Sequence, residues 1–519
     1  MANVSVICIE GRKEHARHSI FLKKRGNEMP CTTLLVGKKA TYDGSTMIAR
    51  NEDSGAGHYN PKKFVVVEPQ DQPRHYKSVL SHVEIELPDN PMRYTAMPNG
   101  LDGEGIWGAA GVNSANVSMT ATETITTNER VLGADPMVCY EPAQDGRPEK
   151  AGGIGEEDIV SITLPYICSA REGVQRLGSL LEQYGTYEMN GIAFSDVDEI
   201  WWLETIGGHH WIARRVPDEA YVVMPNQLGI DYFSLEDAFG EQKEFMCSAD
   251  LREFIRDNYL DLSKDGEFNA RYAFGSASDS DHIYNTPRAW YMQRYFNPAD
   301  TWWDGDDADY RPDSDDITWC REPERKITVE DVKYILSSHY QGTPYDPYAV
   351  HGDPSLRGSF RPIGVNRNNF LSLTQIRPYM PENIRTIEWL ALGSNVFNAF
   401  VPFYANVDTT PAYFATAGKR VTTESFYWSN RMIGALADTQ YGSCIQPITR
   451  YQMEVLSRGR VILNRTDKKY ADGSASPADL EKVNQEISDM AQKATDDILD
   501  KVLFEVSNRM KNQFSLSDR

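Results

Sequence analysis

The sequence has few cysteines and no long apolar run. Seven cysteines are spread over 519 residues and no two are spaced as a CxxC pair, which argues against a disulfide framework and against a zinc ribbon. No window approaches the 18 consecutive apolar residues of a membrane-spanning helix. The apolar run Val4–Ile9 is too short for the core of a secretory signal, and charged residues follow it at once. We therefore expect a cytoplasmic protein with reduced cysteines and no membrane partner.

Positive charge is also scarce. Lys and Arg number 53 against 75 Asp and Glu, which gives a formal net charge of −22 at pH 7. No basic stripe compensates for this field, so it repels phosphate backbones and we expect no nucleic-acid partner. No HExxH or similar ligand spacing occurs, and the sequence predicts neither a metal nor another cofactor. His209 and His210 are neighbours on an expected strand, so we expect them to point to opposite faces and to be structural.

The composition is otherwise that of a globular protein, with 40% hydrophobic and 25% charged residues. The 27 Tyr, 19 Phe and 10 Trp are sufficient for a large core. The length allows two to four domains or a single large α/β sandwich. There is no internal repeat and no low-complexity linker. The first thirty residues differ from the rest because they carry a basic cluster on an acidic protein.

Turn signals between β-branched, apolar segments predict several strands. Cys31–Gly37 and Thr46–Arg50 flank an Asp-Gly pair and form an expected β-hairpin. With its turn centred on Thr41, Cys31 would lie opposite Asn51. Further strands are expected at 191–194, 199–203, 210–216 and 221–224.

Apolar periodicity predicts two clear helices. One has Val174, Leu177 and Leu181 on one face and ends at Gly185. The other is a long C-terminal helix with Ser476 as its N-cap, and its apolar face comprises Leu480, Val483, Ile487, Met490, Ala494, Ile498 and Val502. Hairpins and long helices without βαβ alternation favour an α+β fold.

An aspartate-rich stretch lies at about 299–320. Eight aspartates occur between residues 300 and 316, together with Trp302 and Trp303. Their spacing does not fit an EF-hand, so a solvated insertion loop is a better interpretation than a calcium loop. A substrate-facing rim with the tryptophans as a wall is an open alternative.

The first hairpin brings chemically reactive groups to one strand end. Residues 50–53 (Arg-Asn-Glu-Asp) return to the beginning of the strand at Cys31, so a thiol, a guanidinium and two carboxylates converge there. If the chain starts at Cys31, the freed α-amine, with a pKa of about 7.7–8.0, is a base beside a thiol with a pKa of about 8.5. On these residues alone a buried structural cysteine is the simpler interpretation. A dyad with His209, His210 or His351 also stays open.

The segment Cys31–Asp53, CTTLLVGKKATYDGSTMIARNED, resembles the opening of the cysteine N-terminal-nucleophile (Ntn) dipeptidases of the dipeptidase A type. Further similar segments follow in the family's order at 111–124, 208–218, 223–227, 339–348 and 361–367. The resemblance extends from Cys31 to the C-terminal helix. It implies a four-layer αββα Ntn-hydrolase sandwich with antiparallel sheets and dipeptide hydrolysis without a metal. Bile-salt hydrolases and penicillin V acylases are more distant relatives.

The resemblance also implies roles for individual residues. Cys31 matches the nucleophile that forms an acyl-enzyme, and its α-amine matches the base. Arg50 matches the arginine beside the thiol, where a cation stabilises thiolate. Asp53 matches the acid that orients the α-amine. Asn226 matches an amide donor to the oxyanion.

Two further positions follow from the resemblance less directly. Arg367 matches a later arginine of the bile-salt hydrolase branch, with Arg361 as the competing match. The oxyanion asparagine of the distant relatives falls on Glu123, and an ionised carboxylate cannot donate to an oxyanion. We therefore expect Glu123 or a nearby acid to bind the α-ammonium of the substrate.

The first thirty residues have two interpretations. They form a propeptide that is removed by cleavage of the Pro30–Cys31 bond, or Met29 is the true start and the preceding residues are a mis-assigned leader. Residues 31–519 then form one Ntn-hydrolase peptidase domain with insertions. In both cases Cys31 must become the first residue before its α-amine can act.

The leading functional hypothesis is a dipeptidase that acts on small peptides with a free amino end. A same-fold amidase for N-acyl amino acids, bile conjugates or penicillin-like amides is the nearest alternative. A non-catalytic member of the fold and a papain-like Cys–His enzyme are further alternatives. We expect a homo-oligomer, the common case among soluble enzymes.

Overall fold

The computed structural model describes residues 31–510 except 56, 102, 104 and 265, and for residues 121–123 it describes the backbone alone. The expected leader, including Pro30, therefore lies outside the described residues. Helices and antiparallel strands combine in an α+β fold, as the sequence predicted. Within the described residues no helix is long and apolar enough to cross a membrane.

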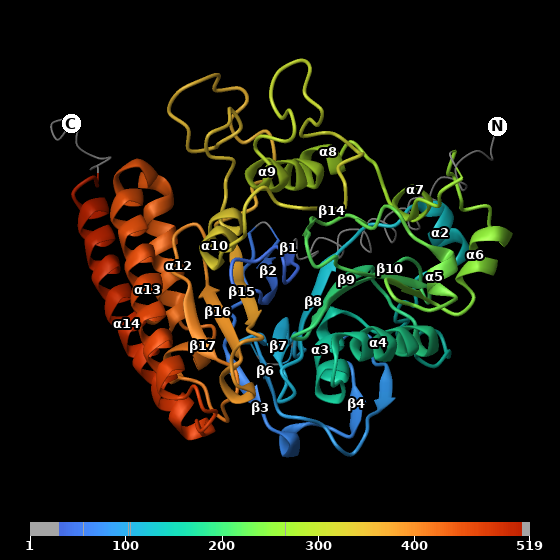
Figure 1. Ribbon diagram of the computed structural model, residues 1–519, viewed down its shortest axis with the longest axis horizontal. Helices are drawn as coiled ribbons and strands as arrows, with labels where there is room; N and C mark the ends of the chain where they lie inside the picture. Colours follow the sequence, from blue (N-terminus) through green and yellow to red (C-terminus); the bar gives the residue numbers. More distant parts are fainter. Residues whose placement is uncertain (1–30, 56, 102, 104, 265, 511–519) are drawn as a thin grey trace, which may run out of the picture.

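A seven-stranded antiparallel sheet carries the first hairpin at its centre (Figure 1). Its strands, in spatial order, are β14 (Cys320–Arg321), β12 (Tyr221–Met224), β1 (Cys31–Val36), β2 (Thr46–Asp53), β15 (Asn368–Ile376), β16 (Thr386–Leu392) and β17 (Val401–Tyr404). All six neighbouring pairs are antiparallel. Every residue of β1 and β2 is buried, because strands in the middle of a covered sheet have no edge or face in solvent.

A six-stranded sheet packs face to face against the first. Its strands, in spatial order, are β13 (Phe245–Cys247), β11 (Trp211–Arg215), β10 (Ile200–Thr205), β9 (Asn190–Ser195), β8 (Ser118–Thr124) and β7 (Ala110–Val112). Strands β8 and β9 lie against β1 and β2 of the other sheet. Two small ribbons, formed by β3 (Val65–Val67) with β6 (Tyr94–Ala96) and by β4 (His75–Lys77) with β5 (Glu84–Glu86), complete the strands.

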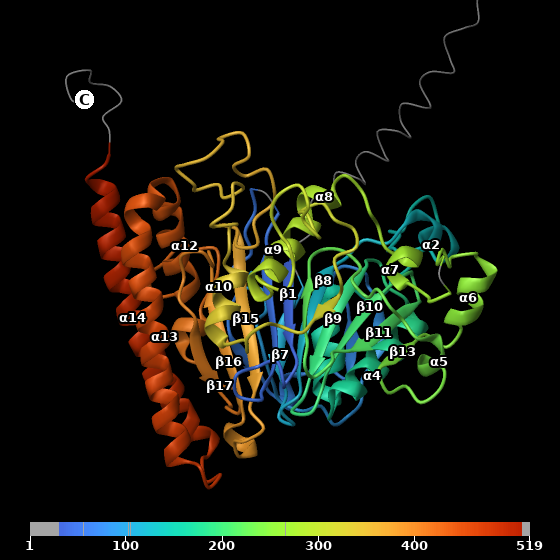
Figure 2. The ribbon, with the colours of Figure 1, turned by 45° about the horizontal axis from the view of Figure 1, so that its top comes forward.

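Helices flank both sheets. Figure 2 shows α12, α13 and α14 on the side of β16 and β17, and α4 beside β9 and β10. The longer helices are α3 (Glu156–Thr163), α4 (Ala170–Tyr184), α9 (Thr286–Phe296), α10 (Val329–Leu336), α12 (Phe426–Ala437), α13 (Tyr441–Lys469) and α14 (Pro477–Ser507). The short helices are α2 (Glu129–Ala134), α5 (Leu235–Ala238), α6 (Leu251–Asp257), α7 (Ala270–Phe274), α8 (Asp281–Tyr284) and α11 (Ala412–Ala415).

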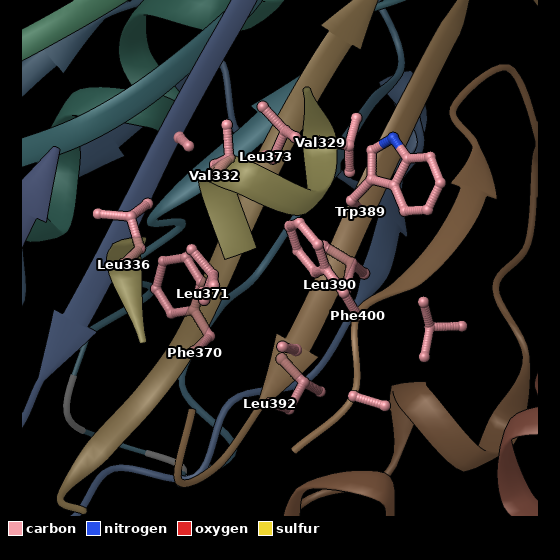
Figure 3. Packing of buried hydrophobic residues seen from close by; sticks show 14 of the residues in the cluster. Val329, Val332, Leu336, Phe370, Leu371, Leu373, Trp389, Leu390, Leu392 and Phe400 are labelled. Carbon is pink, nitrogen blue, oxygen red and sulfur yellow. The ribbon is translucent and has the colours of Figure 1, made fainter. Parts of the chain in front are cut away.

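The core fixes the central strands against their covering helices. Figure 3 shows Val332 and Leu336 of α10 packed with Leu371 and Leu373 of β15, and all four side chains are fully buried. Burial of one such side chain stabilises the fold by about 1.5–3 kcal/mol. The strands that carry the candidate residues are therefore held on a rigid support.

The sequence predictions for local structure were mostly confirmed. Helix α14 has Ser476 as its N-cap, with Ser476 and Asp479 forming a capping box, and α4 ends at Gly185. The hairpin register was wrong by one residue, since Cys31 pairs with Glu52 and not with Asn51. The last pair of the hairpin is Val36 with Met47, which places its centre between residues 41 and 42.

The two tryptophans of the aspartate-rich stretch do not form a common wall. Trp303 is 5% exposed and belongs to the main core, where its Nε1 donates to the carbonyl oxygen of Asn297 at 2.6 Å. Trp302 is 66% exposed. Trp303 therefore ties the loop to the fold, and Trp302 alone faces solvent.

Candidate active site

The thiol of Cys31 lies at the beginning of β1 and contacts the guanidinium of Arg50. The distance from Arg50 Nη2 to Cys31 Sγ is 2.9 Å, and both side chains are fully buried. Arg50 is two residues before Glu52, the strand partner of Cys31, so all three side chains are on one face of the sheet. The observed register of the hairpin produces this arrangement. The sequence predicted that residues 50–53 return to the strand end at Cys31, but its register would have put Arg50 and Glu52 on the other face.

Negative groups hold Arg50 in place. The same Nη2 atom donates to Glu156 Oε1 at 2.6 Å, and Nη1 donates to the carbonyl oxygen of Ala109 at 3.3 Å. Burial alone would lower the pKa of Arg50, but negative charge at Cys31, Glu156 and Glu52 raises it above its usual value. Arg50 therefore stays charged, and a permanent cation at this distance favours the thiolate form of Cys31.

A second buried ion pair adjoins the first. Lys62 Nζ lies 3.1 Å from Glu52 Oε1, and Asn369 Nδ2 donates to the same oxygen at 3.1 Å. Burial lowers the pKa of Lys62, and the charge of Glu52 opposes this shift. Two cations and two carboxylates thus alternate around the thiol as Lys62, Glu52, Arg50 and Glu156.

Asp53 lies next along β2 and faces the other way. Its carboxylate accepts hydrogen bonds from Nη2 of Arg361 and, at 2.9 Å, from Nδ2 of Asn368. Arg361, the competing match, therefore reaches the expected site. Arg367 does not reach Asp53 through any contact in the structure, and its Nε donates to the carbonyl oxygen of Ser54 at 2.6 Å.

Asn226 follows β12, the strand beside β1, and is linked to Cys31 by Arg288. Its Nδ2 donates to the carbonyl oxygen of Thr124 at 2.8 Å, and its Oδ1 accepts from Arg288 Nη2 at 2.7 Å. Arg288 Nη1 also donates to the carbonyl oxygen of Cys31 and, at 2.7 Å, to Thr32 Oγ1. The guanidinium has no acceptor, so its contact fixes Oδ1 as the accepting end of the Asn226 amide and the NH₂ group as the donor end, with one of its two N–H groups bound to Thr124.

Glu123 lies on β8, where its backbone pairs with Gly191. The pairing between β8 and β9 is irregular between Thr120 and Glu123. The Glu123 side chain lies outside the described residues, so its expected contact with a substrate ammonium stays a prediction.

The expected arrangement of the two adjacent histidines was wrong. His209 and His210 precede β11 in a turn, so strand alternation does not apply to them. Their Nδ1 atoms lie 3.0 and 2.7 Å from the two carboxylate oxygens of Asp135. Burial would raise the pKa of Asp135, but the hydrogen bonds from His210 and His209 lower it overall. Both rings thus serve one structural carboxylate, and the third candidate, His351, is exposed.

Within the described residues, no three His, Cys, Asp or Glu side chains gather in a way that could hold a metal ion. The groups around Cys31 consist of two cations, two carboxylates and amide donors, a set that supports nucleophilic attack by a thiolate.

Comparisons with known proteins find similarity to peptidases. The family model described as "Peptidase family C69" matches residues 30–454. A protein named "Dipeptidase" from Bifidobacterium longum (strain NCC 2705) is 56% identical, with 94% of this chain and all of the relative aligned. A "Probable dipeptidase A" from Streptococcus pyogenes serotype M18 is 54% identical over 96% of this chain and all of that protein. "Dipeptidase A" of Lactobacillus helveticus is 45% identical over 94% and 99% of the two chains.

Proposed function

Since the chain belongs to peptidase family C69, the cysteine dipeptidase A family, we propose that it hydrolyses dipeptides with Cys31 as an N-terminal nucleophile. The contact of 2.9 Å between Arg50 Nη2 and Cys31 Sγ at the beginning of β1 is the observation that carries this proposal. A buried thiol beside a buried cation is poised as thiolate, whereas a structural cysteine needs no such partner. The relatives named dipeptidase supply the substrate class.

The working chain begins at Cys31. The Pro30–Cys31 bond is cleaved, either in a propeptide of residues 1–30 or after a short leader that starts at Met29. The family match begins at residue 30, which supports this boundary. Residues 31–519 then act as one peptidase domain, with the stretch at about 299–320 as an insertion. Its two sheets and flanking helices are the four-layer αββα Ntn-hydrolase sandwich in this proposal.

The reaction begins with transfer of the thiol proton to the α-amine of Cys31. The thiolate then attacks the scissile carbonyl carbon, and the negative charge that develops on its oxygen is stabilised by the free N–H of Asn226 Nδ2. Collapse of this intermediate breaks the C–N bond, and the α-ammonium donates its proton to the leaving amine. Water, deprotonated by the same α-amine, hydrolyses the thioester and releases the first amino acid.

The neighbouring residues position these groups. Arg50 stabilises the thiolate, and Asp53, held by Arg361, orients the α-amine. Arg288 joins the Cys31 carbonyl to the Asn226 amide and thereby fixes the distance between nucleophile and oxyanion donor. Glu123 or a nearby acid receives the free ammonium of the substrate.

The proposal also covers the partners, the location and the oligomeric state of the protein. The net charge of −22 supports a protein without nucleic-acid partners. We place it in the cytoplasm, as a homo-oligomer that acts on small peptides. The sparse cysteines support a reducing compartment.

Hydrolysis of alanyl-leucine and of N-acetyl-alanyl-leucine by the processed protein tests this function. The proposal predicts cleavage of the dipeptide, slow or no release of leucine from the acetylated form, and loss of both activities in Cys31→Ala. Equal rates on the two substrates would favour the same-fold amidase. Full activity of Cys31→Ala would show that Cys31 is not the nucleophile.

A further inference from the structure

One carboxylate oxygen beside the thiol has no hydrogen-bond partner. Glu52 is fully buried, and its Oε1 is bound by Lys62 and Asn369, each at 3.1 Å. Its Oε2 is buried too and has no hydrogen-bond partner among the residues that the structure describes. Arg50 Nη1 lies 3.7 Å from this oxygen, which is beyond hydrogen-bond distance. A buried carboxylate oxygen in this state is unfavourable until a donor reaches it.

The free oxygen lies on the same side of the sheet as the nucleophile. Cys31 and Glu52 are direct partners in the β1–β2 register, and such partners have Cβ atoms about 4.5–5.5 Å apart. The guanidinium of Arg50 approaches both groups, through Nη2 at Cys31 and Nη1 at Glu52 Oε2. The unpartnered oxygen is therefore a near neighbour of the thiol.

This spacing fits the chemistry of a free amino terminus. In an amino acid residue the nitrogen and the carbonyl carbon are both bonded to Cα, and they lie ~2.5 Å apart. When the thiol attacks the first carbonyl of a dipeptide, the ammonium must therefore lie within a few ångströms of Sγ. An ammonium and a carboxylate form a short, charge-assisted hydrogen bond.

Among the described residues, the site lacks a hydrogen-bond donor for Glu52 Oε2 and not a further charge. Arg50 and Lys62 are balanced by Glu52 and Glu156, and the Cys31 thiolate is balanced by the α-ammonium that receives its proton. A substrate ammonium supplies the missing donor to Oε2. A neutral N-acyl group in the same place would leave Glu52 Oε2 without a donor.

We infer that Glu52 Oε2 binds the α-ammonium of the first substrate residue and makes the enzyme specific for peptides with a free amino end. This inference rests on the proposed function and assigns to Glu52 the role that the sequence suggested for Glu123. Lys62 and Asn369 are positioning residues, because they hold Oε1 and direct Oε2 away from themselves. Glu52 touches the substrate beside the bond that breaks.

The test compares alanyl-leucine with propionyl-leucine, in which hydrogen replaces the ammonium. Wild type, Glu52→Gln and Glu123→Gln are assayed for kcat/KM on both compounds and for alkylation of Cys31 by iodoacetamide. Glu388→Gln is the matched control, because Glu388 is a fully buried acid of the same sheet outside the site.

In wild type, alanyl-leucine is the better substrate. Glu52→Gln lowers kcat/KM for alanyl-leucine by about 100-fold, the size of effect that follows loss of one charge from a buried pair. It changes the value for propionyl-leucine little and does not slow alkylation, because loss of the Glu52 charge leaves the field of Arg50 less offset. Glu388→Gln and Glu123→Gln keep the wild-type preference. If Glu52→Gln does not fold, Glu52→Asp retains the charge but withdraws the oxygen, and it loses part of the preference.

Four results overturn the inference. An equal loss on both substrates, with slower alkylation, shows that Glu52 acts through Arg50 and not on the substrate. If Glu52→Gln keeps the preference for alanyl-leucine, or if Glu123→Gln loses it, another group binds the α-ammonium. If wild type hydrolyses neither compound, the proposed function is wrong, and the role of Glu52 that rests on it is wrong too.

Discussion

Replacement of Arg50 by glutamine should raise the pKa of the Cys31 thiol. Unit charges about 4 Å apart interact by about 4 kcal/mol at an effective dielectric constant near 20. That energy corresponds to about 3 pKa units at 1.36 kcal/mol per unit. Glu156 and Glu52 offset part of the cation's field, since they lie 2.6 and 3.7 Å from its nitrogens. We therefore expect the pKa to rise by about 2, which lowers the thiolate fraction by up to about 100-fold at pH values below the wild-type pKa.

The assay is the pH dependence of Cys31 alkylation by iodoacetamide, read by peptide mass because Cys139 and Cys168 are exposed and react as well. Arg377→Gln is the matched control, since Arg377 is a buried arginine paired with Asp467. The control should leave the midpoint of the Cys31 profile unchanged. An Arg50→Gln protein that is folded and shows the wild-type midpoint would refute the role of the cation.

Three further predictions concern buried carboxylates. Arg50 Nη2 contacts both the Cys31 thiol and the Glu156 carboxylate. Glu156→Gln removes the negative charge that offsets the cation, so the midpoint of Cys31 alkylation should shift to lower pH, and a shift to higher pH would contradict this. Asp53→Asn leaves Arg361 buried without its counterion, so it should lower the free energy of unfolding by about 3–5 kcal/mol and should also lower kcat. Urea unfolding measures the first effect, and a wild-type free energy of unfolding would contradict the importance of this ion pair. Burial raises the pKa of Glu388 to about 8, against about 4.3 when unfolded, so the folded chain retains a proton that the unfolded chain releases and stability falls between these pH values. Glu388→Gln should therefore be more stable than wild type by a few kcal/mol at pH 8 and equally stable at pH 4. Urea unfolding at the two pH values measures this difference. The same difference at both values would contradict the link between Glu388 protonation and stability.

Local sequence signals were sufficient for the part of the site that one hairpin builds. Cys31, Arg50 and Asp53 lie on two strands joined by a short connection, so their proximity follows from the turn alone. The one-residue error in register arose because the strand ends within the connection were not marked by the sequence. As a result Glu52, and not Asn51, became the partner of the nucleophile.

The long-range part of the site carried no such signal. Glu156 begins α3 in a run of three acids that is typical of a helix N-terminus, and nothing in that pattern directs it to Arg50. Lys62 comes from a loop and Arg288 from α9, and both are brought to the strands by tertiary packing. Arg361 and Arg367 were both candidates from sequence, and the structure brings Arg361 to Asp53.

Helix caps were predictable because they are local. The Ser476 box lies within four residues, and the prediction for α14 was confirmed. The two histidines show the opposite case, since the strand prediction extended one residue too far, to His210. In the turn before β11 both rings reach the same carboxylate of Asp135.

The proposed mechanism requires Cys31 to be the first residue of the working chain. The most direct measurement is the intact mass and N-terminal sequence of purified wild type and Cys31→Ala, with alanyl-leucine hydrolysis assayed on the same samples. We expect that active wild type begins at Cys31 and that Cys31→Ala is inactive. Wild type that retains residues before Cys31 and still cleaves the dipeptide would contradict it, because a peptide-bonded nitrogen cannot serve as the base.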